Sequence, residues 1–575
     1  MDMVQTDILI LGSGGAGLLA ALHARKVNPE AKITIAVKGL LGKTGCTRMV
    51  QGGYNVAVAE GDSAERHFMD TIDGGKWLNN QDLAWALVTG AQDRIRELEN
   101  EHGCFFDRNP DGSMHQKAFA GQTFDRTVHK GDLTGIEIIN RLAEQVWSRD
   151  IERMEDHRAV ELIKARDSSG LAGVLMIDMR SGGFRYVGAK AVLVATGGGP
   201  SMYLYHTPSG DKSCDGMAML LRAGLPLRDM EMVQFHPTGL VAGRDTRITG
   251  TIIEEGLRGY GGHLLAGDGR RFMHRYDERE ERATRDIVSR AMYEEMRAGN
   301  VGPNGGLYIT MKHLDAGEVR KRFKGMVERC ADVGFDLVGG DVEVVPTAHY
   351  MMGGCEFNLD CSTALPGLFV AGEDAGGVHG ANRLGGNGVA NSTVFGGIAG
   401  ESMGVYVRQI NALPDPDQTA LDHGMSRCRQ PLGRARGNAD EIRQPLYQCM
   451  WDDVGIIRDA ASLDRSGKTM KKLEADLADV SLDAGNLAYN LGWHDWLNLH
   501  NLLLVSEAIR VAAIARENSR GAHYRADFPD AGDLATSRYT KVALHNGAMA
   551  VTTEPVEFSR VHPEGSAAKK KELPT

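Results

Sequence analysis

The chain contains few cysteines, and none of them is spaced like a metal ligand. The eight cysteines are scattered through 575 residues, and no two form a Cys-x-x-Cys pair. This scatter excludes the usual spacings of an iron–sulfur cluster or a zinc site. We therefore predict reduced thiols and no metal site in this chain.

The sequence also lacks segments that would carry it into a membrane. Residues 1–7 do not have the basic and then apolar order of a secretory signal, and no uninterrupted apolar run approaches about 18 residues. These absences predict a soluble, cytoplasmic protein. It would reach the cytoplasmic face of the inner membrane only by docking through partner subunits.

The chain has fewer basic than acidic residues, and it is rich in glycine. The formal net charge is −11, which excludes nucleic acid as the expected partner and requires a local basic pocket for any anionic substrate. The 72 glycines indicate that the backbone approaches a ligand closely at many points. A chain of this length is expected to form several domains.

Two glycine-rich segments lie far apart in the chain. The first has the sequence Gly-Ser-Gly-Gly-Ala-Gly over 12–17, and the second has His-Gly-Ala-Asn-Arg-Leu-Gly-Gly-Asn over 379–387. An apolar run, Ile8 to Leu11, precedes the first segment and a second apolar run follows it. This order predicts a strand, a tight turn and a helix whose N-terminus faces a pyrophosphate. Together the segments predict one long cofactor held at both ends.

The end of the second predicted strand, 33–37, indicates which dinucleotide is bound. A NAD-binding unit carries an acidic residue for the ribose near this point, but the strand ends here in Ala36-Val-Lys38. NAD is therefore disfavoured, and FAD fits the longer series of contacts. Further glycine turns and carboxylates lie at 51–53, 195–198, 213–216 and 371–374.

The chain divides into segments of different character. Strand and helix signals alternate to about residue 200, as expected for a sheet of buried parallel strands. Charged, helix-rich sequence over 232–344 indicates an inserted domain, and a strand-like run at 367–372 resumes the first pattern. After a polar linker at 411–417 come amphipathic helices, such as Leu502 to Arg516. Short strand-like pieces and a basic end, 569–571, follow Asp530.

Ten motifs, in this order over nearly the whole chain, resemble one family. It comprises the flavoprotein subunits of succinate dehydrogenase and fumarate reductase and also includes L-aspartate oxidase. The motifs are Gly12–Gly17, Gln51–Gly53, Phe119–Gln122, Asp132–Gly135, Gln234–Gly239, Glu255–Gly259, Arg285–Asp286, Pro346–Tyr350, His379–Asn387 and Arg516–Tyr524.

The resemblance implies an α/β fold. An inserted α+β capping domain closes over a discontinuous Rossmann-like FAD-binding domain, and a helical domain and a small C-terminal region follow. The predicted boundaries are 1–231 and 345–411 for the FAD-binding domain, 232–344 for the capping domain, 412–530 for the helical domain and 531–575 for the C-terminal region.

The resemblance also implies a reaction and the residues that carry it out. Hydride passes between flavin N5 and a succinate- or fumarate-like dicarboxylate, and an iron–sulfur partner subunit exchanges the electrons. Arg285 matches the family's proton-transferring arginine, and Glu255 and Arg258 match the relay that resupplies its proton. The implied substrate-binding residues are His236, His349, Arg383, Glu254, Phe119 and Gly52. The predicted FAD contacts are Gly12, Gly14, Gly15, Ala16, Gly17, Lys38, Thr44, Gly45, Gln51, Gly52, Gly53, Ala195, Thr196, Gly197, Asp215, Glu373, Arg383, Asn387 and Gly388.

Three departures from the family pattern affect the expectation. Cys46 replaces the histidine to which other members link the flavin, so FAD is predicted to bind non-covalently unless Cys46 itself forms a thioether with it. Glu254 replaces a threonine whose hydroxyl touches a substrate carboxylate, and two facing carboxylates repel in a dry site. Gly388 and Asn391 replace a serine and an aspartate of the turn under the flavin.

Two alternatives stay open from the sequence. The enzyme could be an L-aspartate oxidase or act on a substituted succinate, because Glu254 could meet an ammonium group. The chain could also be a flavin-loaded assembly subunit without chemistry. Retention of six expected site residues argues against that second alternative: His236, Glu255, Arg258, Arg285, His349 and Arg383.

Overall fold

A seven-stranded sheet holds the first glycine-rich turn. The computed structural model describes residues 1–210, 212–243, 246, 248–433, 438–482 and 485–563. Strand β1 lies between β2 and β9, and all its pairings are parallel, as are those of β2 with β6 and of β9 with β16. Buried runs such as Ile8–Leu11 form this parallel centre, as expected for strands covered on both faces. The strands are β1 (Asp2–Leu11), β2 (Ile33–Ala36), β6 (Glu152–Met154), β7 (His157–Lys164), β8 (Leu171–Asp178), β9 (Gly183–Val194) and β16 (Leu368–Val370).

The expected alternation of strand and helix up to about residue 200 is wrong after residue 157. Strands β7, β8 and β9 follow one another directly and pair antiparallel. Short turns reverse the chain between them, with positive φ at Ser168 and Gly182. A direct reversal needs no crossover helix, so none is present at these two connections.

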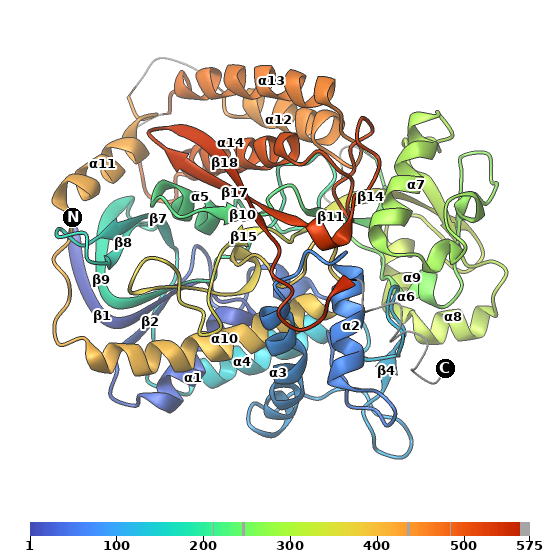
Figure 1. Cartoon of the computed structure of the whole chain (residues 1–575), viewed down its shortest axis with the longest axis horizontal. Coiled ribbons are helices and arrows are strands. Elements are labelled where there is room, and N and C mark those ends of the chain that lie inside the picture. The colour runs from blue at the N-terminus through green and yellow to red at the C-terminus, as the bar shows by residue number, and fades with distance from the viewer. Residues whose placement is uncertain (211, 244–245, 247, 434–437, 483–484, 564–575) are drawn as a thin grey trace.

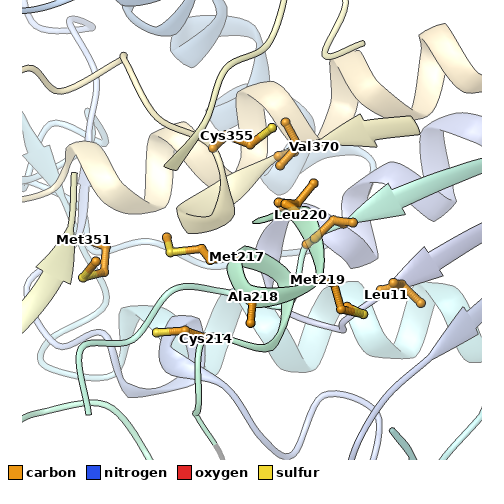
Figure 2. Packing of buried hydrophobic residues seen from close by; sticks show 14 of the residues in the cluster. Leu11, Cys214, Met217, Ala218, Met219, Leu220, Met351, Cys355 and Val370 are labelled. Carbon is orange, nitrogen blue, oxygen red and sulfur yellow. The ribbon is translucent and has the colours of Figure 1, made fainter. Parts of the chain in front are cut away.

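Helices cover the parallel strands, and two of them pack at backbone distance. A Cβ added at Gly396 would lie 2.6 Å from the Ala16 oxygen, and one at Gly400 would lie 2.2 Å from the Ala20 oxygen. Helices α1 and α10 therefore touch through their main chains. These helices are α1 (Gly15–Val27), α2 (Ala64–Gly74), α3 (Gln81–Asn100), α4 (Thr134–Trp147), α5 (Asp215–Arg222) and α10 (Asn387–Tyr406). Apolar side chains of α5 lie near Leu11 of β1 and Val370 of β16 (Figure 2).

Residues within 232–344 contribute most of a second, antiparallel sheet. Its order is β11-β14-β13-β12, and it has its own buried cluster, which includes Phe272, Met292 and Leu307. This part lies at one side of the molecule, on the right in Figure 1. Its elements are β11 (Val233–Leu240), α6 (Gly256–Gly259), β12 (His263–Leu265), α7 (Arg285–Arg297), β13 (Leu307–Thr310), α8 (Ala316–Arg322), α9 (Lys324–Ala331) and β14 (Asp341–Met351).

In the described residues after 417 the structure has four α-helices. They are α11 (Gln418–Arg429), α12 (Asp440–Asp453), α13 (Ala460–Ala478) and α14 (Leu491–Ala515). Helix α14 as a whole is apolar on most sides and packs between α13, α5 and the C-terminal strands. Within the predicted segment, Leu502 to Arg516, partly exposed side chains such as Glu507 and Arg510 lie at helical spacing on one face. Among the described residues α14 alone is long and apolar enough to cross a membrane, and 61% of its most apolar window is buried inside the protein. Core helices commonly have this composition.

Two small sheets complete the fold. One brings the C-terminal strands back to the body of the protein in the order β15-β10-β17-β18, which confirms the strand-like pieces predicted after Asp530. The basic end at 569–571 lies outside the described residues. The other sheet has the order β3-β5-β4. These strands are β3 (Tyr54–Asn55), β4 (Gln116–Lys117), β5 (Thr127–Val128), β10 (Leu227–Arg228), β15 (Gly354–Cys355), β17 (Arg538–His545) and β18 (Ala548–Pro555).

Candidate active site

The first glycine-rich turn has the geometry that the sequence predicts. Gly12 has φ +110°, and a Cβ there would lie 2.2 Å from the Ala195 oxygen of the neighbouring strand end. A Cβ at Gly17 would lie 2.0 Å from the Gly12 oxygen, so this glycine lets α1 pack against the turn. The N-cap residue of α1, Gly14, has no side chain to cap the helix, Thr47 Oγ1 accepts only from the Gly15 N–H at 3.3 Å, and the first turn carries no acid. The turn can therefore offer backbone N–H groups to an anion.

A cavity of about 850 Å³ joins this turn to the predicted substrate residues. All but three of the predicted site residues line it. The lining residues among them are Gly12, Gly14, Gly15, Ala16, Lys38, Thr44, Gly45, Gln51, Gly52, Gly53, Phe119, Ala195, Thr196, Gly197, Asp215, His236, Glu254, Glu255, Arg285, His349, Glu373, Arg383 and Gly388. Segments more than 360 residues apart thus share one elongated site, which fits a long cofactor.

Three predicted residues do not line this cavity. Gly17 faces the turn itself, and Arg258 lies behind Glu255. The side-chain oxygen of Asn387 accepts hydrogen bonds from Asn55 at 2.8 Å and from His67 at 2.9 Å. Asn387 therefore holds the start of α10 in place rather than facing the cavity.

A buried carboxylate lies beside the end of β2, where the sequence has no acid. Asp215 accepts hydrogen bonds from Lys38 at 2.8 Å and from Arg158 at 2.7 Å. Burial by itself would raise the pKa of Asp215, but Arg158 and Lys38 outweigh burial and hold the pKa well below its usual range. An ionised acceptor thus reaches this place from helix α5 instead of from the strand.

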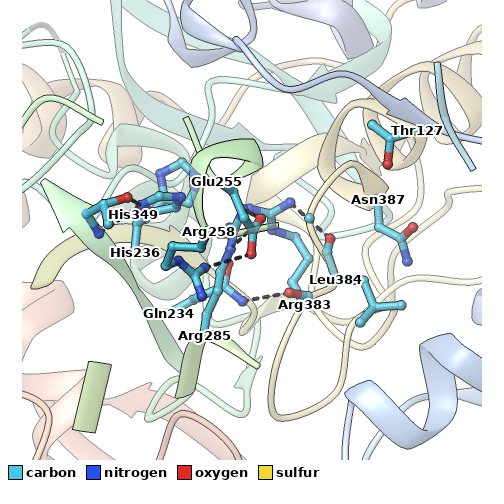
Figure 3. A network of polar contacts seen from close by, with 12 residues as sticks. Thr127, Gln234, His236, Glu255, Arg258, Arg285, His349, Arg383, Leu384 and Asn387 are labelled. Carbon is cyan, nitrogen blue, oxygen red and sulfur yellow. Dashed lines mark hydrogen bonds and ion pairs between the residues drawn. The ribbon is translucent and has the colours of Figure 1, made fainter. Parts of the chain in front are cut away.

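The opposite end of the cavity carries a buried cluster of two arginines and a glutamate (Figure 3). Arg285, the first residue of α7, donates to Glu255 Oε2 from Nη2 at 2.6 Å and from Nε at 3.2 Å. Arg258 of α6 donates from Nη2 to Glu255 Oε1 at 3.0 Å. Burial opposes ionisation of Glu255, but the two arginines lower its pKa below the usual value. The carboxylate is therefore ionised and bridges the two guanidinium groups.

Gln234 forms hydrogen bonds with two arginines of the site and so fixes their relative position. Its side-chain oxygen accepts a hydrogen bond from Arg285 Nη1 at 2.9 Å, and its Nε2 donates to the backbone oxygen of Arg383 at 2.7 Å. We did not predict a role for Gln234, although it stands in the same motif as His236. The sequence offered one indication of this role: Gln234 is a polar residue two positions before His236 on a buried strand, and such residues point to the same side of the sheet.

Arg383 and two histidines line the cavity next to this cluster. The guanidinium of Arg383 lies 4.4 Å from the ring centre of Tyr350, and its buried Nε has no hydrogen-bond partner among the described residues. Burial and the nearby Arg285 lower the pKa of Arg383 to about 10. The pKa of each histidine falls far below its usual value, also through burial and Arg285. His236 and His349 are therefore neutral, and their ring centres lie 5.5 Å apart.

Each histidine has one nitrogen engaged by the protein. Nδ1 of His236 accepts from the backbone N–H of Thr238 at 3.3 Å, so the proton lies on Nε2. Nδ1 of His349 lies 2.8 Å from the hydroxyl oxygen of Thr207. The tautomer of His236 leaves its Nε2–H as a donor for a ligand.

Glu254 also lines the cavity, and a lysine pairs with it. Lys117 Nζ, on β4, lies 2.8 Å from Glu254 Oε1. Burial raises the pKa of Glu254, and Lys117 only partly offsets this. We did not predict a role for Lys117, because its pairing joins segments 137 residues apart.

Cys46 lies at the start of a short 3-10 helix, η1 (Cys46–Met49), and lines the cavity. None of the eight cysteines, all of which lie in the described residues, forms a disulfide. Among the described residues, no three His, Cys, Asp or Glu side chains are grouped so that they could hold a metal ion.

A glycine turn at a helix N-terminus and a paired arginine cluster at the far end of one cavity are the features of an FAD-dependent oxidoreductase. The FAD binding domain family matches residues 7–389, and the C-terminal family of fumarate reductase flavoproteins matches 443–569. The chain belongs to the succinate dehydrogenase and fumarate reductase flavoprotein family, whose enzymes act on CH–CH bonds.

Individual relatives agree over nearly full length. The chain is 40% identical to a subunit of the fumarate reductase (CoM/CoB) of Methanothermobacter marburgensis, over 92% of this chain and 95% of that protein. It is 34% identical to the fumarate reductase flavoprotein subunit of Escherichia coli, over 92% and 89%. A variant of the E. coli quinol fumarate reductase flavoprotein superposes with a TM-score of 0.92 and 31% identity, over 98% of both chains. The predicted α/β fold is confirmed.

Proposed function

We propose that this chain interconverts a four-carbon dicarboxylate pair of the fumarate and succinate kind. The observation that supports this most directly is the grouping of Arg285, Glu255 and Arg383 with two neutral histidines in the cavity that also contains the glycine turn. FAD, when bound, supplies the hydride donor and acceptor at its isoalloxazine ring. The named relatives act on fumarate, which agrees with the two-ended anion site proposed here.

The proposed binding mode uses separate groups for the two carboxylates. Arg383 presents a planar guanidinium with an unengaged Nε, which suits a carboxylate. His236 offers its Nε2–H to the other end, and His349 and Arg285 line the same part of the cavity. Fixing both ends orients the central carbons and excludes water from them.

Arg285 is the proposed proton donor and acceptor for a substrate carbon. A guanidinium releases a proton only at high pH, so it must be resupplied at once. Glu255 lies within 2.6 Å of Arg285, and Arg258 lies within 3.0 Å of Glu255, which makes a continuous relay. The positive charge of Arg285 also stabilises the enolate-like charge that develops during transfer.

A substrate screen tests this proposal. We expect the FAD-loaded protein to reduce fumarate with a reduced dye, or to oxidise succinate with an oxidised dye, faster than it converts aspartate or substituted succinates. Turnover of aspartate alone would contradict the proposal and support the oxidase alternative. Absence of turnover with every dicarboxylate would favour a non-catalytic subunit.

FAD is proposed to bind without a covalent link. The imidazole that forms the link in other members is replaced by the Cys46 thiol. We expect the flavin to separate from the polypeptide on acid or heat denaturation. Fluorescence that persists on the denatured 62.3 kDa band in a gel would contradict this prediction.

Glu254 gives specific support to a second candidate, a dicarboxylate with an amino or hydroxyl substituent. Its carboxylate lines the cavity, and an ionised acceptor there would bind such a group. We expect Glu254→Thr to raise affinity for unsubstituted fumarate or succinate by about tenfold, or about 1.4 kcal/mol, because it removes repulsion and frees Lys117 to attract a carboxylate. The dissociation constant can be measured by flavin absorbance.

Lys117→Met serves as the opposite variant. It leaves Glu254 without its partner, so affinity for the same ligands should fall. Unchanged affinity in both variants would mean that the pair does not act on the substrate. Weaker binding of a substituted succinate in Glu254→Thr alone would support the second candidate.

The remaining proposals concern the partner subunits and the domains of the chain. The named relatives are subunits, which supports partner subunits for this chain. We propose that one partner carries an iron–sulfur centre and that the chain docks through its partners at the cytoplasmic face of the inner membrane. The separate sheet and hydrophobic cluster built largely from 232–344 support the proposed capping domain, and helices α11–α14 support the helical domain. Copurification of the natively expressed chain followed by iron analysis would test the partner.

A further inference from the structure

A second cavity lies directly behind the arginine cluster. Its volume is about 1070 Å³, and we call it the outer cleft. Its lining includes Thr284 and Asp286, which flank Arg285, and Gly259, which follows Arg258. The outer cleft therefore borders the segments that hold the proposed proton-transfer residues.

Phe119 forms part of the wall between the outer cleft and the first cavity, because it lines both. Two glycines make room for its ring. A Cβ at Gly52 would lie 2.4 Å from Phe119 Cζ, and one at Gly385 would lie 2.7 Å from its Cδ2. The side chain of Phe119 is thus wedged between the glycines, with Glu255 and Arg285 close to Gly385.

The outer cleft is positive in a chain whose net charge is −11. Five lysine and arginine side chains line it, against three aspartates. Two of these charges are neutralised by partners outside the lining, since Arg279 pairs with Asp277 and Asp70 pairs with Arg126. The cleft therefore keeps an excess of cationic groups.

Among the described residues, four of the five cations have no acidic partner, and one of these four, Arg520, is buried and donates to Ser537 and to the Ala531 oxygen instead. Lys76, Arg282 and Arg290 form no ion pair with any carboxylate in the described parts of the chain. Arg290 lies 4.5 Å from the ring centre of Tyr524, and Arg282 is exposed at the end of the 3-10 helix η3 (Glu280–Arg282). Unpaired cations in a walled cleft raise the local concentration of anions.

We propose that the outer cleft is the vestibule through which the dicarboxylate approaches the site, and that Lys76, Arg282 and Arg290 attract it there. This inference rests on the proposed function, because it assumes a dianionic substrate. The cations act on association, whereas Arg383 and the histidines retain the bound ligand. Charge in the vestibule should then change the association rate and leave dissociation and turnover unaltered.

The test compares Arg282→Glu/Arg290→Glu with Arg297→Glu. Arg297 is an exposed residue at the other end of α7 and lines neither cavity. The FAD-loaded protein is mixed with malonate, an unreactive dicarboxylate, and binding is followed by flavin absorbance in stopped flow. We expect the double variant to bind about tenfold more slowly at low ionic strength, with an unchanged dissociation rate. At about 1 M salt, where the Debye length is about 3 Å, the difference should largely disappear.

Each outcome discriminates between explanations. Equal association rates for the double variant, Arg297→Glu and the parent would overturn the vestibule while leaving the proposed function intact. A lower turnover with unchanged association would instead assign the outer cleft to proton delivery and also overturn the vestibule. Failure of the parent to bind malonate, fumarate or succinate would overturn the proposed function and the vestibule together.

Discussion

Replacing Arg285 with lysine is expected to lower turnover by at least about a hundredfold. Lysine keeps the positive charge but has one nitrogen in place of a planar fork. In the parent, Arg285 bonds Glu255 through Nε and Nη2 and bonds Gln234 through Nη1. A single ammonium group cannot keep all three contacts and also reach the substrate. Steady-state kinetics with fumarate or succinate measures the loss.

The flavin content of Arg285→Lys should hardly change, since the glycine turn lies at the other end of the cavity. Arg297→Lys on the same helix is the matched control and should retain full turnover. Near-normal activity of Arg285→Lys would remove this residue from the mechanism. A large rise in KM with an unchanged kcat would reassign Arg285 to substrate binding alone.

Replacing Gly12 with alanine is expected to abolish stable FAD binding. The backbone there has φ +110°, which costs about 1–3 kcal/mol for a residue with a Cβ. In addition, the new Cβ would lie 2.2 Å from the Ala195 oxygen, a backbone atom at the end of the central strand β9. The turn must therefore move, and affinity for FAD should fall by well over about tenfold. The ratio of flavin to protein absorbance after purification measures this effect.

Gly14→Ala separates steric strain from contact with the cofactor. Its added Cβ would meet nothing closer than Thr47 Oγ1 at 3.4 Å, and the φ of Gly14 is −72°. This variant should keep the thermal stability of the apoprotein. Any loss of FAD from it would then report close approach of the pyrophosphate to the backbone. Full FAD content in Gly12→Ala would contradict the proposed role of the turn.

Local chemistry explains which parts were predictable. The turn at 12–17 was predictable because its strand, its glycines and its helix are neighbours in sequence, whereas the roles of Arg285 and His236 followed from the resemblance of their motifs to the family. The strand order was harder, because the direct reversals from β7 to β9 depend on turn conformations at Ser168 and Gly182 rather than on apolar periodicity.

Long-range pairing explains what was missed. Lys117 pairs with Glu254 only because the β3-β5-β4 sheet brings β4 to the cavity. No sequence pattern near either residue predicts this ion pair. Asn387 stands in a glycine-rich motif, yet Asn55 and His67 engage its amide from distant segments. A motif identifies the neighbourhood of a site, whereas the direction of each side chain depends on the tertiary partners that compete for it.

The main-chain contact between α1 and α10 has a mechanical consequence. Helix α1 begins at the turn for one end of the cofactor, and α10 begins four residues after Arg383 at the other end. Because Gly396 and Gly400 bring the two backbones together, neither helix can slide along the other without a clash. The two helices therefore move as one unit, and this unit fixes the distance between the two ends of the site. A cofactor longer or shorter than this spacing would therefore not reach both ends of the site.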